Sequence, residues 1–183
     1  MILVYLGVAT SLAALLLVDL LNLDHPVLYP AAHMASYFVH ARAGWLVTVL
    51  ILAGAVAAFA LLPHLRRRAA VAVFGAGLVV AGLVPTQPYG QWDDQSLATL
   101  VHGIGGWAAF VAIPVAAWRL RRDVPAWPGL VAAVLVVLLA VGTVEVMGDG
   151  PDHLGHVAGL VERLLLVAEL GWLVLAARTL RRT

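Results

Sequence analysis

Six long apolar segments constrain the fold of this chain more than any other feature of its sequence. They run approximately over Ile2–Leu21, Ala43–Leu62, Ala69–Val84, Leu97–Trp118, Pro128–Met147 and Leu154–Ala177. A helix of about 20 apolar residues is long enough to cross a bilayer. Only 11% of the 183 residues are charged, against about 25% in an average soluble domain. The sequence therefore predicts an all-α integral membrane protein, in which residues 1–183 form one domain, a six-helix transmembrane bundle.

The arginines predict how this bundle is oriented. The chain has no lysine, and three clusters of arginines follow the second, fourth and sixth segments: Arg66, Arg67 and Arg68; Arg119, Arg121 and Arg122; Arg178, Arg181 and Arg182. Basic residues are concentrated in the cytoplasmic loops of membrane proteins. We therefore expect a multi-pass protein of the plasma (inner) membrane with both termini in the cytoplasm. The bias toward Ala, Val, Leu, Gly and Arg suggests a bacterial source.

The histidines and carboxylates have the opposite distribution and predict a polar site on the extracytoplasmic side. Most of them lie in or beside the other three loops: His25, His33, His40, His102, His153, His156, Asp24, Asp93, Asp94, Asp149 and Asp152. In the first of these loops, Ala31 to Arg42 has the pattern of a short interfacial helix. Its polar side either faces water or points Ser36, Tyr37 or a histidine into the site, and both alternatives remain open.

The last apolar segment carries ionisable residues into the membrane. Ionisable groups at membrane depth are energetically costly and often mark functional sites. At about 100° per residue, the adjacent Glu162 and Arg163 point in different directions, so each needs a partner elsewhere; Asp19, Glu145, His102 and loop residues are the candidates. Glu169, two turns further along, needs a hydrogen-bond partner, a water-filled cavity or a neutral state. The group either locks the helices together or lines a site, and the sequence leaves both hypotheses open.

Three histidines are candidate metal ligands. His102, His153 and His156 are positioned to face one outer cavity, and three imidazoles with a carboxylate suit zinc. The His-x-x-His spacing of the last two is not the i, i+4 pair of helical zinc motifs. Haem held by His102 and His156 is a less favoured alternative. The chain has no cysteine, so a thiolate site is excluded.

The order of short motifs resembles an integral membrane family called domain of unknown function 998. The matching residues are Ser36 in Ala-Ser-Tyr, Gly44-Trp45, Gly82 to Thr86, His102-Gly103, Phe110, Pro114, Gly159 to Arg163 in Gly-Leu-Val-Glu-Arg, and Trp172. The resemblance covers nearly the whole chain and implies six helices around a shared site. Gln87 stands where members often have aspartate, and Gly105 and Gly106 occupy the region of a second histidine, so two potential metal ligands are missing.

A fainter similarity is to multi-helix membrane hydrolases that use Ser, Asp and His residues around zinc. It implies such roles for Ser36, Asp93 or Asp94, and the three histidines His102, His153 and His156. Together with the ionisable residues of the last apolar segment, this makes Glu162, Arg163, His102, His156 and Ser36 the catalytic candidates.

Three functions fit these candidates. The leading hypothesis is an enzyme or binding protein for a lipid-like or amphiphilic small molecule, with a metal-dependent hydrolase as one form. The alternatives are a non-enzymatic membrane subunit or scaffold, and a metal-free isoprenoid or lipid isomerase or cyclase that uses a buried carboxylic acid. The expected partners are the lipid bilayer and that small molecule. A net charge of +1 gives no reason to expect nucleic acid, and the oligomeric state stays open.

Overall fold

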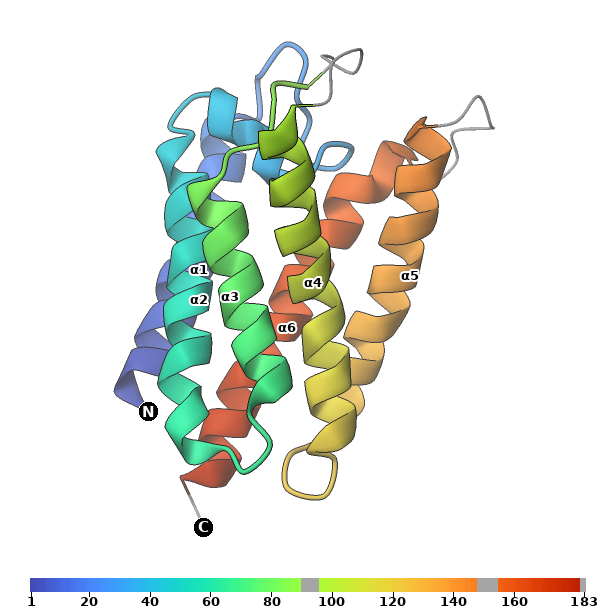
Figure 1. Cartoon of the computed structure of the whole chain (residues 1–183). Helices are drawn as coiled ribbons and strands as arrows, with labels where there is room; N and C mark the ends of the chain where they lie inside the picture. Colours follow the sequence, from blue (N-terminus) through green and yellow to red (C-terminus); the bar gives the residue numbers. More distant parts are fainter. Residues whose placement is uncertain (90–95, 148–154, 182–183) are drawn as a thin grey trace.

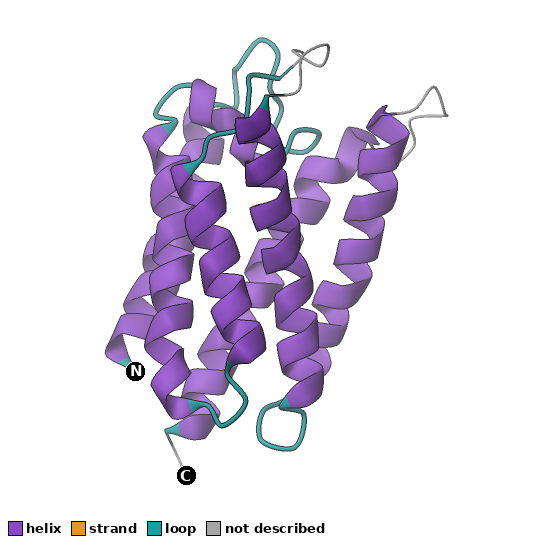
Figure 2. Ribbon diagram, viewed as in Figure 1, coloured by secondary structure: helices purple, strands orange, loops and turns teal. Residues whose placement is uncertain are grey.

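Helices account for nearly all of the regular structure in the computed structural model, which describes residues 1–89, 96–147 and 155–181 (Figures 1 and 2). The described residues form no strand. The α-helices are α1 (Ile2–Leu21), α2 (Trp45–Leu61), α3 (Ala69–Leu83), α4 (Leu97–Arg119), α5 (Trp127–Met147) and α6 (Ala158–Leu180). Short 3-10 helices are η1 (Ala35–His40), η2 (Leu62–His64) and η3 (Gly155–Val157).

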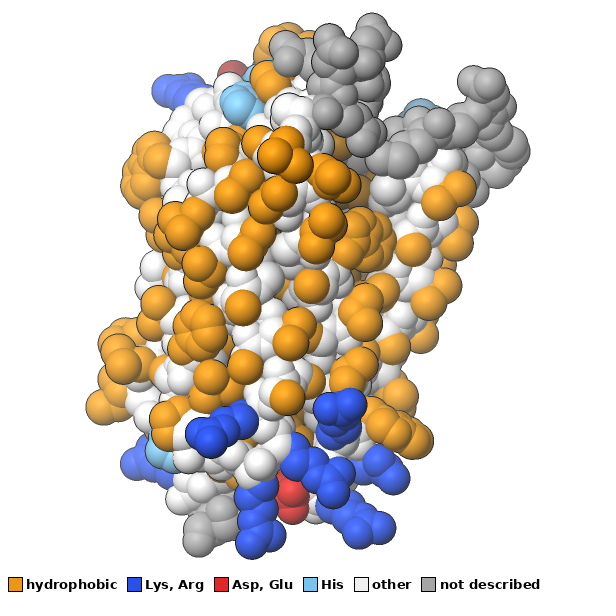
Figure 3. Space-filling model, viewed as in Figure 1, with side chains coloured by type: hydrophobic (Ala, Val, Ile, Leu, Met, Phe, Trp, Pro, Cys, Tyr) orange, Lys and Arg blue, Asp and Glu red, His pale blue; other side chains and the backbone are white. Residues whose placement is uncertain are grey.

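The composition of these helices is that of a multi-pass membrane protein. Four stretches are long and apolar enough to cross a bilayer: Ile2–Leu21, Trp45–His64, Leu97–Arg119 and Trp127–Val144. The apolar helix α3 has 15 residues, and α6 carries Glu162, Arg163, Glu169 and Arg178. Apolar side chains cover the flank that Figure 3 shows, as expected for a surface in contact with lipid.

The two ends of the bundle differ in charge. The N-terminus, the end of α6 and the α2–α3 and α4–α5 connections lie together at the lower end in Figure 1. Arginine side chains gather at this end in Figure 3, so it is called the arginine end. The first predicted outer loop and η1 lie at the opposite end, called the η1 end.

The first loop contains less helix than the sequence predicts. A turn closes with the N–H of His33 bonded to the carbonyl of Tyr29, and only Ala35–His40 is helical, as the 3-10 helix η1. Met34 is extended, with φ −59° and ψ 146°, and this separates the turn from η1. Ala43 has a φ of 55°, a left-handed conformation that ends helices, so α2 begins at Trp45 and not at Ala43.

The buried apolar side chains form three clusters within the described residues. The largest joins α1–α4 and α6 toward the arginine end and includes Leu78. The second packs η1 against α1 and α2 and includes Leu50. The third joins α5 and α6 and includes Leu139. These three leucines also line one cavity, which therefore lies where the three clusters meet.

Candidate functional site

A cavity of about 530 Å³ lies between η1 and helices α2 to α6. Binding sites for small molecules usually have volumes of about 300–1,000 Å³ and mostly apolar walls. Here most of the lining is apolar, and Trp107 and Phe110 form an edge-to-face pair with ring centroids 6.0 Å apart. The polar lining side chains are Ser36, Tyr37, Thr86, Thr99, His102, Thr143 and Glu162. The cavity thus combines an apolar body with a small set of polar groups.

The cavity reaches the flank of the bundle along α4. Two of its lining residues, Leu100 and Ile104, are 53% and 62% exposed. Gly103 and Gly106 line the same wall, and a Cβ added to either glycine would meet no atom within 4 Å among the described residues. The upper parts of α4 and α5 diverge in Figure 1. The cavity is therefore accessible from the side of the bundle that would face lipid.

Glu162 connects this cavity to the first loop. Its side chain is 5% exposed and lines the cavity. Its Oε2 accepts a hydrogen bond of 2.5 Å from the backbone N–H of Ala35, the first residue of η1. A carboxylate has about four lone-pair positions, so this bond orients Glu162 and leaves it able to accept others.

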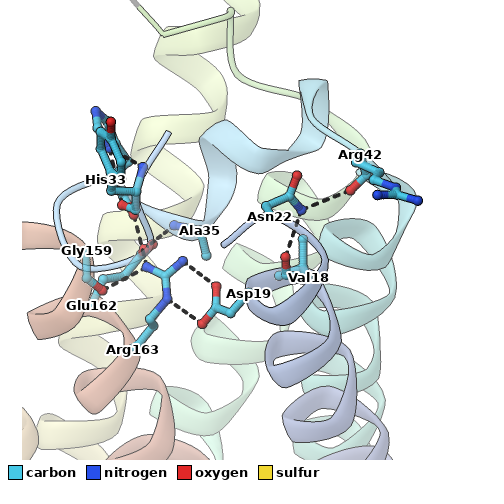
Figure 4. Close-up of polar contacts among 10 residues, drawn as sticks. Val18, Asp19, Asn22, His33, Ala35, Arg42, Gly159, Glu162 and Arg163 are labelled. Carbon is cyan, nitrogen blue, oxygen red and sulfur yellow. Dashed lines mark hydrogen bonds and ion pairs between the residues drawn. The ribbon is translucent and has the colours of Figure 1, made fainter. Parts of the chain in front are cut away.

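Arg163 points to the other side of α6, toward α1 (Figure 4). Its Nε and Nη2 donate to the two carboxylate oxygens of Asp19 at 2.7 and 2.6 Å. Its Nη1 donates to the carbonyls of His33 and Gly159, both at 2.9 Å. This confirms Asp19, one of the predicted candidates, as the partner of Arg163. Arg163 is not among the residues that line the cavity.

Gly159 allows α6 to approach the first loop closely. A Cβ at this position would lie 2.3 Å from the carbonyl oxygen of His33 and 2.4 Å from that of Pro30. The N–H of Leu160 donates to the carbonyl of Ala31 at 2.8 Å. Gly159, Leu160, Glu162 and Arg163 thus all hold residues 30–35, and this group is called the loop clamp. The clamp fixes Ser36 and Tyr37 above the cavity.

The predicted histidines separate into different environments. His102 lines the cavity, and its Nδ1 donates to the carbonyl of Val84 at 2.8 Å, because a carbonyl can only accept. His156 is exposed in η3. His153, Asp93 and Asp94 lie outside the described residues. Within the described part of the chain, no three His, Cys, Asp or Glu side chains lie close enough together to hold a metal ion. Zinc and haem stay predictions.

Two loop residues near the clamp have shifted pKa values. Burial is the main cause that lowers the pKa of His33, and the nearby Arg163 adds to it. His33 Nδ1 lies 2.9 Å from the backbone N of Tyr29 and 3.2 Å from its carbonyl oxygen, and the hydrogen bond to the carbonyl opposes this lowering of the pKa. Burial, reinforced by Glu162, raises the pKa of Tyr37 to about 12. Tyr37 therefore keeps its phenolic proton at neutral pH.

Glu169 lies two turns deeper in α6 than Glu162. It is fully buried, and neither carboxylate oxygen has a hydrogen-bond partner among the described residues. The indole N–H of Trp172, one turn further, also lacks a partner there. Glu169 does not line the cavity, whereas Glu162 does, so the two glutamates of α6 have different surroundings.

The sequence alone does not mark several of the lining residues as candidates, among them Thr143, Trp107 and Gly106. Thr143 lies in the otherwise apolar helix α5 together with Glu145, and its hydroxyl donates to the carbonyl of Leu139 at 2.8 Å. Two polar residues near the end of an apolar segment are the sequence signal for this position. Trp107 and Gly106 carry no comparable signal, because aromatic and small residues are common throughout transmembrane helices.

A family model described as Protein of unknown function (DUF998) matches residues 6–179. No curated protein and no solved structure matches the chain. The similarity to zinc-dependent membrane hydrolases stays a prediction.

Proposed function

The chain belongs to the DUF998 family, and on that premise we propose that it is a membrane protein that binds a lipid-like or amphiphilic molecule in the cavity beneath η1. The observation that carries this proposal is the cavity itself. It offers an apolar volume of about 530 Å³ that reaches the flank of the bundle, together with the buried carboxylate of Glu162. A molecule with an apolar chain and a polar head matches both parts.

The motifs of the family resemblance support this site. Ser36, Thr86, His102, Phe110 and Glu162 come from distant parts of the sequence, and all of them line the cavity. Ser36, Thr86 and His102 also line an adjoining cavity of about 300 Å³. The meeting of these five motif residues at one place supports a shared site, while Gly159 and Arg163 of the same motifs hold the first loop.

Chemical processing of the bound molecule is a second candidate function. Ser36, His102 and Glu162 line the same cavity and supply a hydroxyl, an imidazole and a carboxyl group. Such groups serve hydrolysis, with or without a metal, as well as acid-catalysed isomerisation. Arg163 and His156 do not line the cavity. The contacts of Arg163 favour a role in holding the loop, which is the part of the scaffold hypothesis that the geometry supports.

The proposal includes a six-span topology with both termini in the cytoplasm. The gathering of arginines at one end supports it. The chain contains no cysteine, so single cysteines report each side cleanly. In intact cells that carry the protein in their plasma membrane, a membrane-impermeant maleimide is expected to label Tyr29→Cys at the η1 end. His64→Cys, exposed at the arginine end, is expected to react only after lysis. The reverse pattern would contradict this orientation.

Filling the cavity tests the binding function. In lipid nanodiscs, 11-bromo-1-undecanol is expected to quench the fluorescence of Trp107 in a saturable way. The chain has six tryptophans, so comparison with Trp107→Phe identifies the part of the quenching that comes from Trp107. Gly106→Leu places its side chain in the open space of the cavity wall. It is expected to abolish the saturable quenching without lowering the melting temperature.

Gly171→Leu is the matched control for this experiment. Gly171 is also a helical glycine with no described atom within 4 Å of an added Cβ, but it does not line the cavity. This variant is expected to bind the bromoalcohol as the wild type does. Saturable quenching that survives Gly106→Leu would contradict the proposed function.

A further inference from the structure

We propose that the polar head of the molecule bound in this cavity is an amine or ammonium group held by Glu162, and not a phosphate. This inference rests on the proposed function and specifies its ligand class. Three observations carry it: the ionisable groups that line the cavity, the bonds that the adjacent Arg163 makes to other partners, and the position of Glu162 relative to the lateral opening.

Among the described residues, the cavity wall carries an acidic group and no permanently cationic one. Glu162 is the one carboxylate among the described lining residues, and none of those residues is an arginine. Phosphate-binding sites in proteins generally supply arginine, lysine or a row of backbone N–H groups. A phosphate in this cavity would find no arginine among the described lining residues, and an ionised Glu162 would repel it strongly in apolar surroundings.

Arg163 is next to Glu162 in sequence, but its hydrogen bonds go to groups outside the cavity. Its Nε and Nη2 form the paired bonds to Asp19, and its Nη1 donates to two backbone carbonyls. These bonds occupy four of the five N–H donors that a guanidinium carries. Reaching the cavity would require Arg163 to leave Asp19 as an unpaired and largely buried carboxylate, which is strongly unfavourable.

Two other polar groups of the wall, His102 and Thr143, can accept a hydrogen bond from a ligand. His102 uses Nδ1–H to bind the carbonyl of Val84, so the Nε2 of the neutral ring is an acceptor. The hydroxyl of Thr143 donates its hydrogen bond to the carbonyl of Leu139, so the hydroxyl oxygen of Thr143 can still accept one. An ammonium group carries several N–H donors and a positive charge, and so complements Glu162 and both of these acceptors.

The geometry also separates a head position from a tail position. Glu162 is bonded to the first residue of η1, at the η1 end of the cavity. The open wall at Gly103 and Gly106 and the exposed Leu100 and Ile104 lie on α4, along the flank. An alkyl chain that leaves the cavity there remains in the apolar part of the membrane while its amine stays at Glu162.

Matched single-chain amphiphiles test the inference. Dodecylamine and dodecyl phosphate are compared, at equal mole fractions in zwitterionic nanodiscs, as competitors of the bromoalcohol at Trp107. Dodecylamine is expected to displace it at a concentration about tenfold or more below that of dodecyl phosphate, because a charge-assisted hydrogen bond replaces charge repulsion. Glu162→Gln is expected to remove most of this preference, since its amide oxygen still accepts from Ala35 but carries no charge.

Glu169→Gln is the matched control, because it makes the same change on the same helix outside the cavity lining. It is expected to retain the preference for the amine. Equal displacement by amine and phosphate in the wild type, or a preference that persists in Glu162→Gln, would overturn the amine assignment even if Gly106→Leu still abolishes binding. Should Glu162→Gln fail to fold, the wild-type comparison decides alone. Saturable quenching that persists in Gly106→Leu would instead contradict binding in this cavity.

Discussion

Replacing Arg163 with methionine is expected to lower the free energy of unfolding by about 3 kcal/mol, which is the low end of the range for breaking a buried ion pair. The low end applies because the side chain of Asp19 is 20% exposed and that of Arg163 is 10% exposed. Methionine keeps much of the apolar packing of the arginine stem, but it leaves the Asp19 carboxylate and the carbonyl of His33 without their donor. The loss is measured as reduced thermal stability in mild detergent.

Arg178→Met is the matched control for this variant. Arg178 lies on the same helix but is exposed near the arginine end, and its replacement is expected to change stability by less than about 0.5 kcal/mol. A double-mutant cycle with Asp19→Asn isolates the pair. Additive losses in that cycle would show that Arg163 stabilises the protein without coupling to Asp19, contrary to the paired hydrogen bonds between the two side chains.

Replacing Gly159 with alanine is the second large effect that we expect. In most helix interiors this change stabilises by up to about 1 kcal/mol, because glycine is a poor helix former. Here the new methyl group would overlap the backbone carbonyls of Pro30 and His33. Backbone atoms cannot rotate away as a side chain can, so α6 and the first loop must separate. We expect a loss of about 3 kcal/mol, the upper part of the usual range for overpacking.

Gly171→Ala provides the comparison for this prediction. Its added methyl group meets no described atom within 4 Å, so the variant is expected to keep or slightly raise the melting temperature. Gly159→Ala is also expected to weaken bromoalcohol binding, since Ser36 and Tyr37 follow the segment that it displaces. Wild-type stability in Gly159→Ala would mean that α6 and the loop do not pack closely.

The two expected effects have a common origin in the loop clamp. Glu162 and Arg163 were predicted to need separate partners, because a helix turns by about 100° between adjacent residues. Arg163 finds Asp19, but Glu162 finds a backbone N–H, which no side-chain pattern encodes. The loop also forms the short helix η1 and not the longer helix expected from its polar periodicity, because the backbone is extended at Met34 before η1 and at Ala41 after it.

The sequence by itself determined the class of this protein: an all-helical chain with membrane-crossing segments, and its family, whose short motifs are local strings of residues. These properties follow from composition and segment length, which need no knowledge of neighbours. Only the tertiary structure decided that Glu162 faces a cavity while Arg163 faces α1, and that Gly103 and Gly106 border open space while Gly159 borders a backbone. When a helix is apolar on every side, its sequence does not indicate which face contacts which neighbour. The orientation of each helix is then set by tertiary packing.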